Sequence, residues 1–143
     1  MDNIELRRAT QLAKECPELN QLERELAWEP IAPPPVVHTF TPGLYARTIF
    51  LKAGTLCTSK IHKTEHQYIV SRGSCRVWIP GIGWEMIKAP YHGITKVGTR
   101  RALHILEDTI WTTFHPTMST DLDEIENEII EPHSIPIKPE ELT

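Results

Sequence analysis

Short apolar segments separated by turn residues fill the middle of this sequence. The segments are rich in β-branched and aromatic residues, which are typical of strands. They are LYARTIFLK, HQYIVS, CRVWI, WEMIKA, RALHIL and TIWTTF. Turn residues separate them at Ala53-Gly54, Arg72-Gly73, Pro80-Gly81-Ile82-Gly83 and Glu107-Asp108. Many short strands with frequent turns predict an antiparallel β-sandwich or β-barrel.

The two ends of the chain have different patterns. Apolar residues recur at helical spacing in the first 28 residues, and Pro17 interrupts them, which predicts two short helices. The proline-rich stretch EPIAPPPVV then predicts an extended linker over 29–36. After Pro116, the segment STDLDEIENEII predicts a short helix capped by Ser119 or Thr120. We therefore expect an N-terminal helical extension with its linker (1–35), a barrel (36–116) and an acidic C-terminal arm (117–143).

Length and composition indicate the cellular compartment that such a chain suits. At 143 residues, with 24% charged residues, it has the size and polarity of one soluble domain. We find no apolar run near the roughly 20 residues that a membrane helix needs, and no apolar signal core at the N-terminus. We expect a cytoplasmic protein without a membrane partner. Its three cysteines form no CxxC pair and are expected to be reduced structural thiols.

Charge is divided unevenly along the chain. Residues 36–115 contain ten Lys and Arg against four acids, whereas residues 116–143 contain eight acids against one Lys. A basic middle segment can form an anion-binding surface, or it can be a solvated face that its own acidic tail balances. The basic residues do not cluster in one run and no RNA-recognition signature is present, so no nucleic-acid polymer is expected as a partner.

The stretch CTSKIHKTEHQYIVSRGSCRVW places two histidines, His62 and His66, four residues apart. Its spacing resembles the first motif of the cupin superfamily: Gly54 opens the run, His62 stands at the second histidine, His66 stands at the glutamate, and Gly73 closes it. Lys60 stands where a cupin has its first histidine. The resemblance is greatest to the short cupin-like proteins of bacteriophages. It implies a mainly β fold, a cupin-like double-stranded β-helix or jelly-roll barrel, with the helices added at both ends.

The second cupin motif has its best counterpart in KVGTRRALHILED. Gly98 matches the turn, but Arg101 falls near the slot of the third histidine ligand. The resemblance therefore implies the barrel, whereas the metal of the family lacks one of its usual ligands here. We treat fold and function as separate questions.

Two chemical interpretations follow. In a regular strand Lys60, His62 and His66 point to one side, which in this barrel is the cavity. With His115, which ends the last apolar segment, His62 and His66 could bind one divalent transition metal. Without a metal, the same histidines could act as acid and base beside a bound anion. Lys60 and Arg101 would hold that anion, with Arg47 and Tyr68 also lining the site.

The expected function is recognition of a small anionic molecule in the barrel, bearing phosphate or carboxylate and including nucleotides, with or without turnover by the histidines. An enzyme of this kind would be a hydrolase, lyase or isomerase. One alternative is a metal-dependent cupin enzyme that uses His62, His66 and His115. Another is a non-enzymatic sequestering or structural phage protein, which would work in the host cytoplasm. The short N-terminal helices need a surface to pack on, so we also expect a homodimer or higher homo-oligomer.

Overall fold

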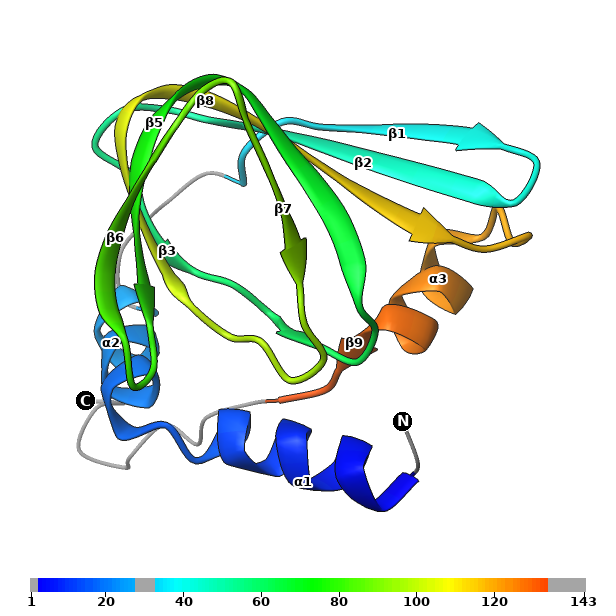
Figure 1. Cartoon of the computed structure of the whole chain (residues 1–143), viewed down its shortest axis with the longest axis horizontal. Coiled ribbons are helices and arrows are strands. Elements are labelled where there is room, and N and C mark those ends of the chain that lie inside the picture. Colours follow the sequence, from blue (N-terminus) through cyan, green and yellow to red (C-terminus); the bar gives the residue numbers. More distant parts are fainter. Residues whose placement is uncertain (1–2, 28–32, 134–143) are drawn as a thin grey trace.

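Seven strands form one bent antiparallel sheet in the computed structural model, which describes residues 3–27 and 33–133 (Figure 1). The central order is β1-β2-β8-β5-β6, with β3 paired to β8 and β7 paired to β5. The strands are β1 (Val36–Thr41), β2 (Leu44–Leu51), β3 (Leu56–Thr58), β4 (Ile61–His62), β5 (His66–Ile79), β6 (Gly83–Lys88), β7 (Tyr91–Thr95), β8 (Ala102–Pro116) and β9 (Ile130–Glu131). The helices are α1 (Asn3–Lys14), α2 (Pro17–Leu26) and α3 (Leu122–Ile129). The mainly β architecture predicted from the sequence is confirmed.

Strands β5 and β8 are continuous where the sequence predicted turns. The pair Arg72-Gly73 lies inside β5, and Glu107-Asp108 lies inside β8. The β5–β8 register shifts repeatedly between Val70 and Cys75, which marks bulges. Gly73 has φ +92°, and a Cβ there would collide with the Asp108 carbonyl oxygen. The turn prediction was therefore wrong, because these residues bend two long strands that curve around the barrel and do not reverse them.

The barrel core follows the alternation of β5. His66, Tyr68 and Val70 are buried, while Gln67 and Ile69 between them are exposed. Strict alternation places every second side chain of the strand inside. The main buried cluster contains Leu51, Tyr68, Val70, Cys75, Val77, Ile87, Ile105 and Trp111. The three cysteines are unpaired thiols, as expected from the sequence, and Cys75 is part of this core.

Helix α1 packs against β4, and helix α2 packs against β3. Pro17 starts α2, where its missing N–H is tolerated, so the predicted break between two helices is confirmed. Leu19 of α2 is 1% exposed and packs with Cys16 and Ala102. Arg100 fixes the contact, since its Nη1 donates to the Ala13 carbonyl oxygen at 3.0 Å. Within the described ranges 3–27 and 33–133, no helix is long and apolar enough to span a membrane.

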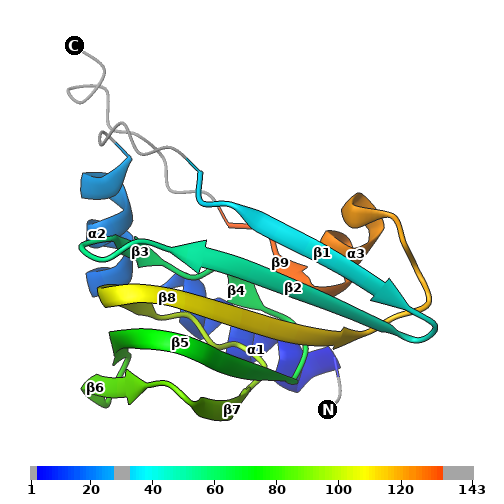
Figure 2. The same cartoon turned by 90° about the horizontal axis from the view of Figure 1, so that it is seen from above.

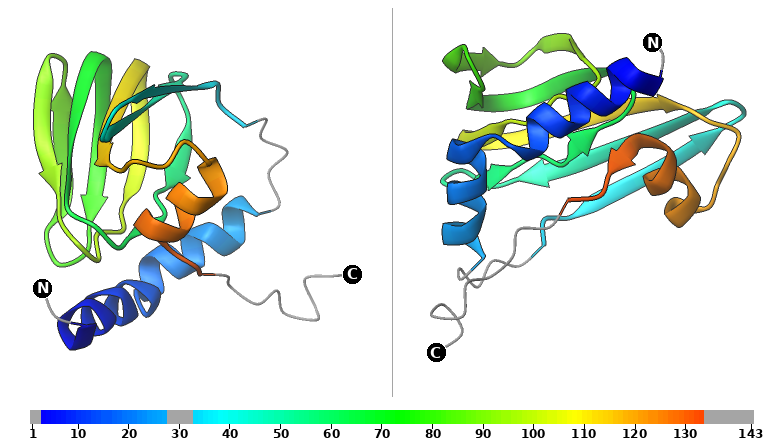
Figure 3. Two further views of the ribbon diagram at one scale, coloured as in Figure 1. Left: turned by 90° about the vertical axis from the view of Figure 1, so that its right-hand side faces the viewer. Right: turned by 90° about the horizontal axis from the view of Figure 1, so that it is seen from below.

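Residues 117–133 of the C-terminal arm fold back onto the barrel (Figure 3, left), and the rest of the predicted arm lies outside the described residues. Asp121 caps α3, accepting from the backbone N–H groups of Asp123 and Glu124; the predicted cap at Ser119 or Thr120 is wrong by one or two residues. Ile125 and Ile129 of α3 pack against buried Tyr45. β9 then pairs with β4 in a separate two-stranded sheet. The arm therefore covers the part of the barrel where β4 begins the histidine segment.

Candidate functional site

Three histidines meet at one end of the barrel. His62 comes from β4, His66 begins β5, and His115 lies near the end of β8. The ring centroids are 4.9 Å apart for His62 and His66, and 4.4 Å apart for His66 and His115. His66 and His115 are 4% and 2% exposed, and His62 is half-buried. Residues more than 50 positions apart in sequence thus form one buried imidazole cluster.

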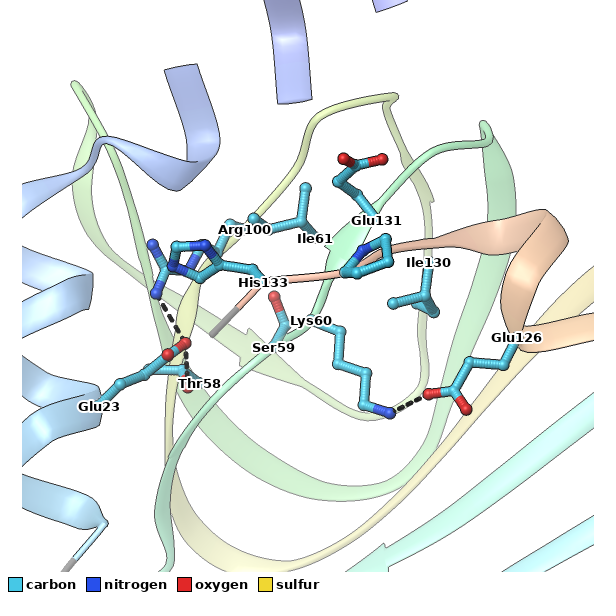
Figure 4. A pocket seen from close by; sticks show the side chains of 11 residues that line it. Glu23, Thr58, Ser59, Lys60, Ile61, Arg100, Glu126, Ile130, Glu131 and His133 are labelled. Carbon is cyan, nitrogen blue, oxygen red and sulfur yellow. Dashed lines mark hydrogen bonds and ion pairs between the residues drawn. The ribbon is translucent and has the colours of Figure 1, made fainter. Parts of the chain in front are cut away.

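Lys60 does not join this cluster. The chain between His62 and His66 is a bend and not a regular strand, because β4 leaves the barrel sheet to pair with β9. Lys60 is exposed and forms an ion pair with Glu126 of α3 (Figure 4). The expectation that Lys60 shares an inward face with His62 and His66 is therefore wrong, since it assumed an unbroken strand. The two histidines nevertheless converge.

The hydrogen bonds of His66 fix where its ring proton lies. Its Nδ1 is 3.2 Å from the Thr64 carbonyl oxygen, which can only accept, so Nδ1 carries the proton in the neutral ring. Nε2 then has a lone pair, is buried, and has no hydrogen-bond partner among the described residues. The Nδ1 atoms of His62 and His115 are also buried without a partner in this part of the chain, while His115 Nε2 lies 2.9 Å from Thr113 Oγ1.

All three imidazoles are held in their neutral form near pH 7. Burial, followed by the neighbouring His66 and then Arg101, lowers the pKa of His62 to about 3. Burial, His66 and Arg47 lower the pKa of His115 to about 4. Burial also lowers the pKa of His66, although the bond to the Thr64 carbonyl opposes this. Neutral imidazole is the form that binds metal ions.

Arg101 is the buried cation of the barrel interior. It is 7% exposed, and its Nη2 donates to Thr95 Oγ1 at 2.9 Å. The guanidinium lies 5.2 Å from the ring centre of Tyr68 and 5.3 Å from that of Trp111, within the range of cation–π attraction. Among the ion pairs of residues 3–27 and 33–133, none involves Arg101. The structure therefore brings Arg101 and Tyr68 together inside the barrel.

Arg47 and Tyr45 occupy successive inward positions on β2. Arg47 pairs in register with Thr113, and Tyr45 pairs with His115. Tyr45 is 2% exposed and stacks on His115 at 5.7 Å, and its hydroxyl lies 2.6 Å from His38 Nδ1. The sequence alone did not decide whether Tyr45 lines the cavity; the β2–β8 register places it against His115.

A surface pocket of about 540 Å³ lies outside this cluster (Figure 4). It opens between α2, the segment before β4, and the C-terminal arm, and its walls include Glu23, Lys60, Arg100 and Glu126. None of the three clustered histidines lines it. Its charges are largely paired with one another, as the Arg100–Glu23 ion pair at 2.7 Å shows. We therefore place the candidate chemistry at the histidines and not in this pocket.

The histidine cluster has the donor type that a transition metal ion prefers, neutral imidazole. Two imidazoles bound to one tetrahedral zinc ion have ring centres about 5.2 Å apart, so the separations of 4.9 and 4.4 Å here are shorter than in a formed site. In the part of the chain that the structure describes, no three His, Cys, Asp or Glu side chains are already oriented around one metal position. Coordination would therefore need ring rotation, which the broad χ2 preference of histidine permits at low cost.

Comparison with known proteins shows the fold but no close relative. The sequence matches no protein-family model, and a search of curated proteins gives no match either. Among solved structures, an uncharacterized conserved protein with a double-stranded β-helix domain from Klebsiella pneumoniae has a TM-score of 0.52 at 14% identity, covering 68% of this chain and 90% of that one. A protein from Neisseria meningitidis has a TM-score of 0.50 at 9% identity, covering 67% and 95%. The predicted double-stranded β-helix fold is thereby confirmed.

Proposed function

We propose that this protein binds one divalent transition metal ion through His62, His66 and His115, and a small anionic molecule beside it through Arg101 and Arg47. The observation that carries the metal part is the hydrogen bond between His66 Nδ1 and the Thr64 carbonyl oxygen. It leaves a lone pair on buried Nε2 without a partner among the described residues. A buried acceptor without a partner costs about 1–3 kcal/mol, and a metal ion would satisfy it.

An anion fits the histidines themselves less well than a metal. The Nε2 lone pair of neutral His66 repels negative charge, so an anion would bind there only if the ring were protonated. Burial opposes that protonation, because it lowers the pKa of all three rings. Neutral imidazoles favour zinc, iron, nickel or copper. We therefore place the anion at the arginines and the metal at the histidines.

Arg101 supplies the argument for an anionic ligand. A guanidinium that is 7% exposed and has no ion pair in the described part of the chain gains from a carboxylate or phosphate. Arg47 lies on β2, which pairs with the β8 strand of His115. Burial and His66 lower the pKa of His115, and the nearby charge of Arg47 lowers it further. A bound ion would act as a Lewis acid on an oxygen atom of that ligand. Tyr45, stacked on His115, would hold that ring in place.

A second candidate is metal-free binding of the same anion, with or without turnover by the histidines. Its binding step depends on Arg101 and Arg47 and does not need the lone pairs of the cluster. It includes sequestration of a small phosphate or carboxylate compound without reaction. Turnover as a hydrolase, lyase or isomerase, and the likeness to cupin-like proteins of bacteriophages, remain predictions in both cases.

Metal content tests the first candidate. Purified protein incubated with zinc, nickel or cobalt and then desalted should retain about one ion per chain, measured by elemental analysis. His66→Ala and His115→Ala should each reduce retention more than tenfold. His104→Ala is the matched control, since His104 lies on the same strand as His115 but pairs with Arg76. Wild-type protein that retains no metal, or equal loss in His104→Ala, would contradict the metal site.

Calorimetric titration with inorganic phosphate and with a small dicarboxylate tests the anion part. Arg101→Gln should weaken binding by one charge-assisted hydrogen bond, about 1.5–3 kcal/mol. Lys60→Gln should leave binding unchanged, because Lys60 is exposed and paired with Glu126. Metal-free protein that binds the anion as tightly as metal-loaded protein would favour the second candidate.

A further inference from the structure

The surface pocket outside the histidine cluster lies between three parts of the chain. Figure 2 shows β4 and β9 between α2, near one end of the molecule, and α3, near the other. The pocket reaches Glu23 of α2 on one side and Glu126 of α3 on the other (Figure 4). Its volume of about 540 Å³ is within the roughly 300–1,000 Å³ of small-molecule sites. It therefore has the position and the size of a second ligand site.

Arg100 brings an unsatisfied donor to this pocket. Its side chain lines the pocket, and the residue is 2% exposed. Nη1 donates to the Ala13 carbonyl oxygen and to Asn20 Oδ1, and Nη2 forms the ion pair with Glu23. Nε is buried and has no hydrogen-bond partner among the described residues. A buried guanidinium N–H without an acceptor favours a ligand that supplies an oxygen atom.

The charges around the pocket balance one another. Three acids of the described residues line it, and each forms an ion pair with a basic residue: Glu23 with Arg100, Glu126 with Lys60, and Glu131 with Lys14. An apolar part of the wall comes from Ile61, Ile130 and Pro132. A balanced lining favours neither a net anion nor a net cation, so it suits a ligand that carries both charges.

The ion pair at the α3 end can open at low cost. The side chains of Lys60 and Glu126 are 66% and 51% exposed, and exposed pairs contribute little to stability. A ligand ammonium group can therefore bind Glu126 beside Lys60 or in its place. Between the two ends, Ser59 Oγ accepts from the Arg101 backbone N–H at 3.0 Å and keeps its own proton to donate.

We propose that this pocket is a second ligand site that binds a short zwitterion, a dipeptide, with its carboxylate at Arg100 and its ammonium group at Glu126. The ion pairs of these two residues lie at opposite ends of the pocket (Figure 4), so the charged groups of the ligand must be separated. In a free amino acid both groups are on one carbon, whereas the ends of an extended dipeptide are about 7 Å apart. Aliphatic side chains of the dipeptide would pack on Ile61 and Ile130.

Calorimetric titration of the full chain with the dipeptide alanyl-leucine tests the proposal. Binding should saturate at one molecule per chain. Acetyl-alanyl-leucine lacks the ammonium group and alanyl-leucinamide lacks the carboxylate, so each should bind about tenfold more weakly or worse. A wild type that binds no alanyl-leucine at about 10 mM, or that binds either blocked form as tightly, would overturn the proposal.

Two variants test the two ends of the pocket. Glu126→Gln should weaken binding about tenfold, because it removes the partner of the ammonium group. Glu65→Gln is the matched control and should bind like the wild type: Glu65 pairs with Lys96 at a similar exposure of 53%, and it is not among the described residues that line the pocket. Arg100→Lys keeps the charge but lacks the Nε–H, so it should also weaken binding. Circular dichroism confirms that Arg100→Lys is folded, and Glu126→Gln decides the test if it is not.

Unchanged affinity in Glu126→Gln or in folded Arg100→Lys, or an equal loss in Glu65→Gln, would contradict the site. Arg101→Gln separates it from the anion site of the proposed function, because Arg101 is not among the described residues that line the pocket. That variant should bind alanyl-leucine normally and phosphate weakly. Loss of alanyl-leucine binding in Arg101→Gln would place the dipeptide in the barrel and overturn the second site.

Discussion

Acid should destabilise this protein through its buried histidines, and His115 gives the clearest test. Burial, His66 and Arg47 hold its pKa at about 4 in the folded chain, against 6.5 for an ordinary histidine. The unfolded state therefore binds the proton first as the pH falls. The resulting stabilisation is fully present above pH 6.5 and is lost as the pH falls from 6.5 toward 4.

The size of the effect follows from that difference in pKa. Each pH unit between the two values costs about 1.4 kcal/mol per histidine. Lowering the pH from 7 to 5 should therefore remove about 2 kcal/mol through His115 alone, since the unfolded histidine titrates over the last 1.5 units of that range. His62, with its pKa lowered to about 3 chiefly by burial, adds a loss of the same sign. A total of about 4 kcal/mol is a large part of the stability of a small domain.

Urea unfolding followed by circular dichroism measures this directly, on protein freed of metal by a chelator. The free energy of unfolding of the wild type should fall steadily from pH 7 to pH 5. His115→Asn should fall by about 2 kcal/mol less over the same range. His92→Asn, an exposed change on β7, should follow the wild type. A wild-type stability that stays constant to pH 5, or an identical pH slope in His115→Asn, would refute the reasoning.

Two further changes test the fold. Leu19→Ala should lower the free energy of unfolding by about 2–5 kcal/mol, because Leu19 is the fully buried contact between α2 and the barrel. A loss below about 1 kcal/mol in urea unfolding would mean that α2 does not pack on the barrel. Gly73→Ala should lower the thermal midpoint through its φ of +92° and the collision with the Asp108 carbonyl. Gly81→Ala is its control, with a similar φ of +80° but no atom within 4 Å, so the difference between the two variants isolates the close approach of β5 and β8.

Local patterns in the sequence predicted the barrel because alternation and strand propensity are local properties. Gly73 shows the limit of such patterns: glycine permits φ > 0 in a hairpin turn and in a bulge alike, and only the partner strand decides between them. The same holds for Lys60. Its direction depends on β4 pairing with Ile130 and Glu131, some 70 residues away, and no periodicity near Lys60 reveals that pairing.

The histidine cluster was predicted for a partly correct reason. His115 was chosen because its segment should run beside a hairpin from Arg101. The structure has no such hairpin, since Ala102–Pro116 is the single strand β8, but the far end of β8 still carries His115 to His66. The chain bends after His62, whereas the prediction assumed a regular strand. That bend brings the rings of His62 and His66 to 4.9 Å between their centres. The direction of Tyr45 could not be decided from the sequence because it depends on where the turns fall, and its contact with His115 arises only from the β2–β8 register.

Strand β8 pairs with β2, β3 and β5, and so joins nearly every part of the sheet. Its partners lie far away along the chain; Tyr45, for example, meets His115. Forming such a distant pairing closes a large loop of chain, and the conformational entropy of that loop is lost before the new contacts can compensate it. Proteins dominated by distant pairings therefore refold in milliseconds to seconds. The barrel should therefore refold slowly for its length, and substitutions in β8 that disturb pairing should slow refolding more than equally destabilising substitutions in α1.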